Sequence, residues 1–214
     1  MELFILILEL AGTAAFALSG AMLALKKNMD LFGVCVMGLT TACGGGVVRD
    51  ILLGALPPVM FRQPVYALTA LGVSLVAFLP AVRQILTSNR RAYVTTILLA
   101  DSAGLGIFTC CAGVTAAVNA GYGDNFFFSV FLGTVTGVGG GVMRDVLAGM
   151  PPYIFVKHIY ACAALAGAML CAALWDIAGS TASMLAGSAL VFLLRLLAAH
   201  YRWNFPHPNH GGKV

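Results

Sequence analysis

Apolar residues in this chain gather into long runs, and short polar segments separate one run from the next. Each run is about 20 residues long, the length an α-helix needs to cross the hydrocarbon core of a bilayer. The runs cover residues 3–25, 31–54, 64–82, 92–116, 125–149, 158–175 and 180–199. The pattern predicts an all-α integral membrane protein, with seven transmembrane helices in one domain (residues 1–200) and a cytoplasmic tail (201–214).

The composition agrees with a membrane protein. Hydrophobic residues make up 60% of the 214 positions and charged residues only 9%, which is too apolar for a soluble domain with a mostly polar surface. The six cysteines all lie inside apolar runs without a CxxC pair, so we expect buried thiols. The net charge of +4 does not indicate a nucleic acid partner, because the basic residues are spread between the spans.

Basic residues in the connections predict the orientation in the membrane. With the N-terminus outside, nine lysines and arginines fall in cytoplasmic segments and only Arg62 falls outside. The nine are Lys26, Lys27, Arg83, Arg90, Arg91, Lys157, Arg195, Arg202 and Lys213. Cytoplasmic loops carry the excess of lysine and arginine, so we expect a multi-pass protein of the cell (inner) membrane with its N-terminus outside and its C-terminus in the cytoplasm.

Two segments of the chain occur twice. The longer match pairs GGGVVRDILLGALPPVMFRQPVYA (Gly44–Ala67) with GGGVMRDVLAGMPPYIFVKHIYA (Gly139–Ala161). A weaker match pairs LAGTAAFA (Leu10–Ala17) with LADSAGLG (Leu99–Gly106). The chain therefore contains an internal repeat that covers most of its spans.

The repeat predicts an inverted duplication. Three spans fall in repeat one (3–82) and three in repeat two (92–175), and residues 180–199 form an added seventh helix. Because each copy makes an odd number of crossings, the second copy is inserted upside down relative to the first. Inverted repeats of this kind are common among transporters and channels, whose ion or substrate site lies between the two copies.

Each copy also places three successive glycines inside an apolar run, namely Gly44, Gly45 and Gly46 in the second span and Gly139, Gly140 and Gly141 in the fifth. Glycine weakens a helix by about 1 kcal/mol relative to alanine. We therefore expect these two helices to be kinked and locally unwound, with freed carbonyls facing protein or water. Close packing between small residues is an equally good interpretation.

Four charged residues follow the glycines: Arg49, Asp50, Arg144 and Asp145. Neighbours on a helix point about 100° apart, so we expect pairing between the copies, Arg49 with Asp145 and Arg144 with Asp50. The charges either line an aqueous pathway or lock the repeats together. The pathway is favoured, because a buried ion pair seldom adds net stability.

Other polar residues stand inside or beyond the spans. Asp101 is a candidate ion site or a partner for a motif arginine, unless backbone or hydroxyl donors satisfy it. Glu9 has no obvious partner, and Arg195 is close enough to a helix end that we expect it to snorkel to the membrane surface. In the tail, His207 and His210 are expected to be solvated rather than to bind metal.

The sequence does not indicate an enzyme. GGGVVRD lacks the Lys-Ser/Thr ending of a phosphate-binding loop and follows a membrane run instead of a strand. No pairing of a nucleophile with a base stands out. We therefore expect no catalytic residue, no cofactor and no metal beyond transient monovalent cations.

Two GGGxxRD motifs, each followed by a Pro-Pro pair, in a seven-span chain with inverted repeats resemble the bacterial branch of the trimeric intracellular cation channels, the TRIC family. The resemblance covers about residues 10–197. It implies a homotrimer in which each protomer has its own pore for monovalent cations such as potassium and sodium. It also implies a gating role for Arg144, at a motif that reads Lys-Glu in animal relatives and Arg-Asp here.

Each motif is net neutral, so cation selectivity would have to draw on pore width, carbonyls and hydroxyls such as Thr40, Thr41, Thr134 and Thr136. Bacterial relatives with the same motif are also described as glycine transporters, which makes a small amino-acid transporter the leading alternative. A membrane scaffold with a sealed centre is the third. The expected partners are membrane lipid, monovalent cations and two further copies of the chain, and not nucleic acid.

Overall fold

The computed structural model describes residues 2–156, 159–201 and 203, and the regular elements in that part of the chain are all helical. The longer helices are α1 (Glu2–Lys26), α2 (Leu31–Leu52), α4 (Val65–Phe78), α6 (Arg90–Ile107), α8 (Phe126–Leu147), α10 (Ala161–Ala178) and α11 (Ser180–His200). The shorter ones are α3 (Val59–Arg62), α5 (Pro80–Ser88), α7 (Thr115–Ala117), α9 (Tyr153–Val156) and two π-helices, η1 (Phe108–Val114) and η2 (Val118–Tyr122). The prediction of an all-helical membrane protein is confirmed: six helices of the described chain are long and apolar enough to span a membrane, and the bent pair of α4 and α5 is the candidate for the seventh.

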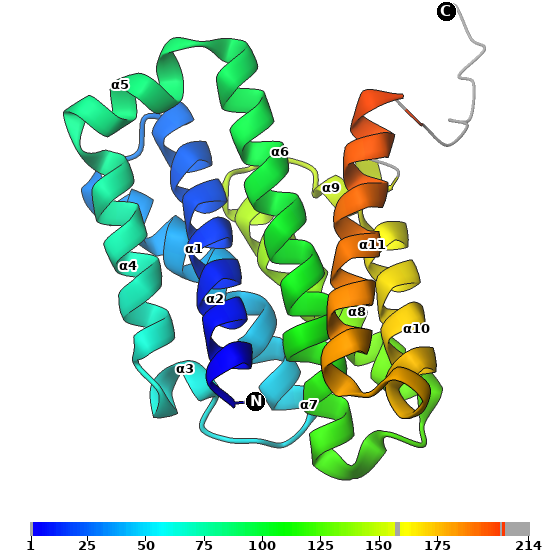
Figure 1. The fold of residues 1–214 in the computed structure, drawn as a ribbon. Coiled ribbons are helices and arrows are strands. Elements are labelled where there is room, and N and C mark those ends of the chain that lie inside the picture. The colour runs from blue at the N-terminus through cyan, green and yellow to red at the C-terminus, as the bar shows by residue number, and fades with distance from the viewer. Residues whose placement is uncertain (1, 157–158, 202, 204–214) are drawn as a thin grey trace, which may run out of the picture.

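Successive spans run in alternating directions (Figure 1). α1 rises from the end where α3 and α7 lie toward the end where α5 lies, and α6 descends beside it. α1 contacts α2, α4 and α6, while α8 contacts α2 and α10. α11 packs against α10 and α6 at the side of the bundle. An inverted duplication followed by one added helix predicts this arrangement.

The third expected span, residues 64–82, is broken near its end. α4 ends at Phe78, and α5 leaves it at an angle of 83°. Proline donates no backbone hydrogen bond and disfavours helical geometry in the residue before it, and Leu79, which precedes Pro80, has φ −54° and ψ 135°. The prediction of one continuous helix to residue 82 is therefore wrong, and α4 itself has only 14 residues.

The fourth span contains a stretch that its apolar pattern does not reveal. α6, η1, α7 and η2 follow one another from Arg90 to Tyr122, with a kink at Gly121, whose φ is +87°. Residues Phe108–Val114 are π-helical. The hydroxyl of Thr115 donates to the carbonyl of Cys110 at 3.1 Å within this wider turn. π-Helical segments are rare and are frequent at functional sites.

The triple glycines hold α2 and α8 close together. Both helices remain α-helical through their glycine segments, so the predicted local unwinding is wrong, while the predicted kink stays a prediction. A Cβ added to Gly45 would overlap the carbonyl oxygen of Thr136, and one added to Gly140 would overlap that of Thr41. A Cβ on Gly139 would lie 3.0 Å from the Cα of Gly45. The geometry supports the alternative interpretation, close packing between small residues.

Both motif helices also end in the same way. In the first copy, Gly54 has a φ of +68° and the amide of Ala55 donates to the carbonyl of Asp50 at 2.8 Å. The second copy has Gly149 with a φ of +65° and a 2.9 Å bond to the carbonyl of Asp145. A glycine with positive φ just after a helix is a common C-terminal cap. The two copies therefore share backbone geometry as well as sequence.

Two smaller expectations have mixed outcomes. All six cysteines are free and four are buried, but Cys162 is exposed, so the prediction of a buried thiol is wrong there. The histidines expected to be solvated, His207 and His210, lie outside the described residues. Three of the basic residues used to predict orientation also lie outside them: Lys157, Arg202 and Lys213.

We expect Gly45→Ala to destabilise the protein and Gly46→Ala to be harmless. The new methyl group at position 45 meets backbone of α8, whereas the position 46 methyl group has only the Arg49 side chain at 4.0 Å. Overpacking of this kind costs about 1–3 kcal/mol, while alanine on its own favours the helix by about 1 kcal/mol. Thermal unfolding of both variants in detergent measures the difference, and equal unfolding midpoints would contradict the close crossing.

Candidate functional site

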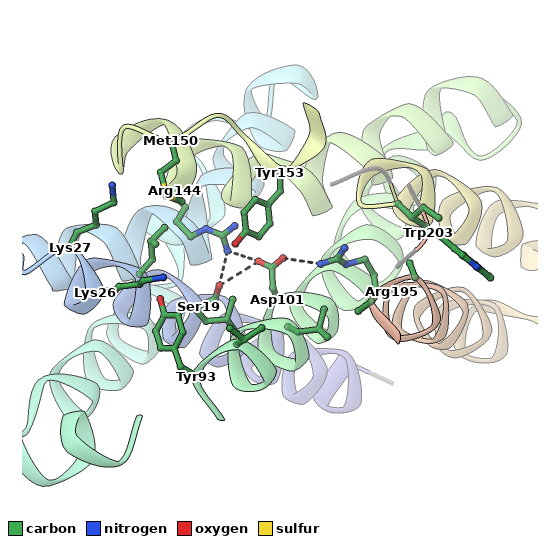
Figure 2. A pocket seen from close by; sticks show the side chains of 17 residues that line it. Ser19, Lys26, Lys27, Tyr93, Asp101, Arg144, Met150, Tyr153, Arg195 and Trp203 are labelled. Atoms are coloured by element: carbon green, nitrogen blue, oxygen red, sulfur yellow. Dashed lines mark hydrogen bonds and ion pairs between the residues drawn. The ribbon is translucent and has the colours of Figure 1, made fainter. Parts of the chain in front are cut away.

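A cavity of about 800 Å³ lies between α1, α6, α8 and α11, at the end of the bundle where α1 and α11 finish (Figure 2). We call it the vestibule. Its outer part is lined by the exposed side chains of Lys26, Lys27 and Trp203. Its floor is formed by buried side chains, among them Asp101 and Arg144. The vestibule therefore leads from the molecular surface to ionisable groups inside the bundle.

Asp101 on α6 is the centre of the floor. Nη1 of Arg144 on α8 lies 2.5 Å from Oδ1 of Asp101 and donates to Oγ of Ser19 on α1 at 2.6 Å. The Ser19 hydroxyl in turn lies 3.5 Å from the same Asp101 oxygen. All three residues are at most 1% exposed. The expectation that Asp101 partners a motif arginine is confirmed, and three helices meet at one carboxylate.

Arg195 on α11 approaches the other oxygen of Asp101. Its Nη2 lies 3.8 Å from Oδ2, within ion-pair range but too far for a hydrogen bond. The guanidinium also sits 4.7 Å above the ring of Tyr160, a cation–π contact. Because Arg195 is 5% exposed, the expectation that it snorkels to the membrane surface is wrong. Its position within the bundle lets it pair with a buried carboxylate.

Each motif arginine pairs with the aspartate that follows it. Nε of Arg144 donates to Oδ1 of Asp145 at 2.9 Å, and Nε of Arg49 donates to Oδ1 of Asp50 at 2.8 Å. The predicted pairing between the copies is therefore wrong. The long arginine side chain folds back across the angle between neighbouring positions. The aspartate is held in place because its second oxygen accepts a backbone amide of the returning chain, that of Tyr153 at 2.8 Å in the second copy.

The first copy forms a smaller cluster away from the vestibule. Nη1 of Arg49 donates to the backbone carbonyl of Ala112, in the π-helix η1, at 3.3 Å. Asp50 accepts the amide of Val59 at 2.6 Å, as Asp145 accepts its amide in the second copy. Arg49 and Asp50 are 8% and 2% exposed. The repeated motif thus builds the same local ion pair twice, in different surroundings.

Glu9, which has no obvious partner in the sequence, is bonded in the structure. The hydroxyl of Tyr66 on α4 donates to its carboxylate. Tyr66 is the residue that the repeat matches with Tyr160, the ring beneath Arg195. Both copies therefore use the same tyrosine position to contact an ionisable side chain, a glutamate in one and an arginine in the other.

The threonines named from the sequence do not line the vestibule. Three of their hydroxyls donate to carbonyls four residues earlier in the same helix, and these belong to Thr41, Thr134 and Thr136. Such bonds are local to the helix. Thr41 and Thr136 lie at the glycine crossing, and Thr134 lines a separate apolar groove between α8 and α10. A role for Thr40 and the other three in an ion pathway stays a prediction.

Sequence reasoning missed Ser19, Tyr160 and the inward position of Arg195. Arg195 could have been found, since it interrupts the apolar run LVFLLRLLAA just as Asp101 interrupts its own. Ser19 has no such signal, because single serines inside membrane helices commonly bond their own backbone. Asp101, Arg144 and Arg195 line the floor, and Asp145, which is bonded to Arg144 but does not line the cavity, brings the formal charge of these four residues to zero. Lys26 and Lys27 make the mouth of the vestibule positive.

The sequence is similar to a known protein family and to bacterial membrane proteins. A family model described as "Glycine transporter" matches residues 6–81 and 98–176, which leaves α11 outside the match. A UPF0126 membrane protein of Deinococcus radiodurans is 40% identical over 200 residues, which covers 92% of this chain and 87% of that protein. The UPF0126 inner membrane protein YadS of Escherichia coli K12 is 38% identical over 204 residues, 94% of this chain and 93% of that protein.

Solved structures are similar over nearly the whole chain. One described under the conductance of TRIC cation channels has a TM-score of 0.83 and 33% identity, covering 97% of this chain and 98% of that chain. The TRIC trimeric intracellular cation channel orthologue from Rhodobacter sphaeroides has a TM-score of 0.84 and 30% identity, with coverage of 94% and 99%. A prokaryotic TRIC channel in 0.5 M KCl has a TM-score of 0.86 and 30% identity, with coverage of 96% and 100%.

We expect Asp101→Asn to destabilise the fold strongly. The change leaves Arg195 without a carboxylate and Arg144 with Asp145 alone, and breaking a buried ion pair costs about 3–5 kcal/mol. Asp176→Asn removes the same charge from an exposed position and is the matched control, with an expected change within about 0.5 kcal/mol. Thermal unfolding in detergent separates the two, and similar midpoints would show that Asp101 does not hold the cluster together.

Proposed function

This chain belongs to the family described as glycine transporter and is similar to UPF0126 membrane proteins, and from that premise we propose that it is a channel for monovalent cations, potassium and sodium. We propose that the ion pathway, called the conduit below, runs inside each protomer between the two repeats. The function is then transport rather than catalysis. The likeness to TRIC channels at 30–33% identity over nearly the full length supports this proposal. One of those proteins is described as trimeric, and we propose a homotrimer here.

The same proposal places the protein in the inner membrane, with α1 starting outside and α11 ending in the cytoplasm. The relative YadS is described as an inner membrane protein. Basic residues at the vestibule end support the orientation, because Lys26 and Lys27 close α1 and Arg90 and Arg91 open α6. Arg62 lies in α3, at the other end of the bundle. The vestibule then opens to the cytoplasm, and lipid surrounds the spans.

The observation that carries the proposal is Asp101 at the floor of the vestibule. A carboxylate oxygen is a suitable ligand for a monovalent cation. Within the described chain, Oδ2 of Asp101 is buried and makes no hydrogen bond. A carboxylate that is only partly satisfied, at the inner end of a cavity, is costly to fold around and is typical of a functional site.

Arg144 supplies the gate in this proposal. Its guanidinium lies 2.5 Å from Oδ1 of Asp101, where a permeating cation would bind. It therefore acts as a tethered cation that competes for the carboxylate. Asp145 is a second, adjacent carboxylate that stays bound to Arg144, so the guanidinium can leave Asp101 without losing every anionic partner.

We expect Arg144→Ala to raise the open probability of single channels in planar bilayers by about tenfold, equivalent to losing about 1.4 kcal/mol of closed-state stabilisation. Asp101 then has no tethered competitor on Oδ1. Unitary potassium currents from the purified protein are the primary measurement. Arg91→Ala, which removes an exposed arginine at the start of α6, is the matched control.

An unchanged conductance and open probability in Arg144→Ala would remove Arg144 from the gate while leaving the channel itself in place. If the wild-type protein carries no unitary potassium current, the channel proposal is wrong.

A second candidate function, transport of a small amino acid such as glycine, is favoured by the charge of the vestibule. Four basic residues line it, Lys26, Lys27, Arg144 and Arg195, against the single acid Asp101. A zwitterion presents a carboxylate to such a surface and an ammonium group to Oδ2 of Asp101, which makes no hydrogen bond although Arg195 lies 3.8 Å away. The family description points to the same substrate.

Proteoliposomes loaded with unlabelled glycine test this second candidate. A glycine transporter is expected to exchange external labelled glycine with saturation, and Asp101→Asn is expected to lower the exchange rate by about tenfold or more, because the ammonium group loses a charged partner worth about 1.5–3 kcal/mol. Labelled alanine and leucine show whether the site selects by size. If the protein shows no saturable glycine exchange but carries potassium currents, the transporter is rejected and the channel remains.

A further inference from the structure

Two phenylalanines meet between the two charged clusters. Phe16 on α1 and Phe108 at the start of η1 stack with ring centroids 5.3 Å apart and an interplanar angle of 19°. They are only 1% and 7% exposed. Neither belongs to the lipid-facing surface, and neither lines the vestibule.

Their order along the helices fixes their depth. Phe16 comes three residues before Ser19 on α1, and Phe108 comes seven residues after Asp101, so the rings lie about 5–10 Å beyond the vestibule floor at 1.5 Å per residue. Because α1 and α6 run in opposite directions (Figure 1), both steps lead away from the vestibule. Ala112, whose carbonyl accepts from Arg49, is one turn further on. The ring pair therefore separates the Asp101 cluster from the Arg49 cluster.

The layer around the rings is tightly packed. A Cβ added to Gly104 would overlap the ring of Phe16, and a Cβ added to Gly12 would lie 3.4 Å from the ring of Phe108. Leu105, which is fully buried, belongs to the same apolar cluster as the two rings. An apolar constriction without polar partners excludes water and so blocks ions.

The repeat shows that this layer breaks the symmetry of the two halves. When the match of Leu10–Ala17 with Leu99–Gly106 is carried on along the helices, Ser19 corresponds to Phe108 and Gly12 corresponds to Asp101. The polar pair that binds Arg144 thus has a glycine and a phenylalanine as its counterparts. Arg49 binds a backbone carbonyl instead.

We propose that Phe16 and Phe108 form the hydrophobic barrier that closes the conduit in this conformation and limits the flux through it. This inference rests on the proposed function only in placing the conduit between the repeats. Phe108 opens the π-helix η1, and a return of that segment to α-helix would turn the residues on either side relative to each other. The ring pair therefore has a route to separate while α2 and α8 stay fixed at their glycine crossing.

Potassium efflux from proteoliposomes tests the barrier. Phe108→Ser gives repeat two the serine that repeat one has at the corresponding position. It is expected to raise the potassium efflux rate by about tenfold, which corresponds to a barrier lower by about 1.4 kcal/mol. Phe131→Ser is the matched control, since Phe131 also stacks on a neighbouring phenylalanine, with centroids 6.4 Å apart, but is 44% exposed on α8. Phe16→Leu, which installs the residue of repeat two, is a milder variant with the same expected direction in case Phe108→Ser does not fold.

A second measurement does not depend on permeation. Ala112→Cys places a thiol one turn beyond the rings. A small membrane-impermeant thiol reagent is applied from the vestibule side, and the labelling of the same chain without Ala112→Cys is subtracted as background. Labelling is expected to be slow with both rings present and about tenfold faster when Phe108→Ser is added, for the same barrier difference. Phe16→Leu is expected to raise the labelling rate by a smaller factor.

The outcomes separate the two proposals. Faster labelling without potassium efflux in any variant keeps the barrier and rejects the channel. Potassium efflux and labelling that are the same in wild type, Phe108→Ser and Phe16→Leu keep the channel and overturn the barrier.

Discussion

A guanidinium group held inside a membrane protein needs a carboxylate beside it, and this requirement organises the centre of the fold. Asp101 meets Arg144 of α8 and Arg195 of α11, and shares Arg144 with Ser19 of α1. One carboxylate thus ties four helices together. Well-packed apolar side chains would stabilise such a centre at least as well. The charges are therefore better explained by what the site does than by stability, and the unbonded oxygen of Asp101 points the same way.

Periodicity and repetition made much of the architecture predictable. Six of the seven apolar runs correspond to helices of the described chain that are long enough to span a membrane, and the third is broken. The doubled motif predicts two copies of one local geometry, which is seen in the caps at Gly54 and Gly149. The pairing of the charges was not predictable. It depends on where the chain returns after each helix, since the amide of Tyr153 fixes the direction of Asp145 and hence its contact with Arg144.

Two further features depend on tertiary contacts that no local pattern contains. A run of three glycines is equally compatible with an unwound helix and with a close helix crossing. The crossing is recognised only in the structure, where the carbonyls of Thr41 and Thr136 lie against the glycines of the facing helix. The π-helix at Phe108–Val114 has no compositional signal either. Identical motifs also acquire different partners, since Arg144 faces Asp101 while Arg49 faces a carbonyl. Near-symmetric halves therefore produce a cavity at one end and a packed aromatic layer beyond it.

The bend between α4 and α5 has a consequence for the surrounding lipid. At 1.5 Å per residue, a helix of 14 residues is about 21 Å long, against a hydrocarbon thickness of roughly 30 Å. The acyl chains beside α4 must compress, or α5 must make up the deficit by lying along the headgroup boundary. Hydrophobic mismatch at this elbow makes the protein's energy depend on bilayer thickness, so that thin and thick membranes favour different tilts of the same bundle.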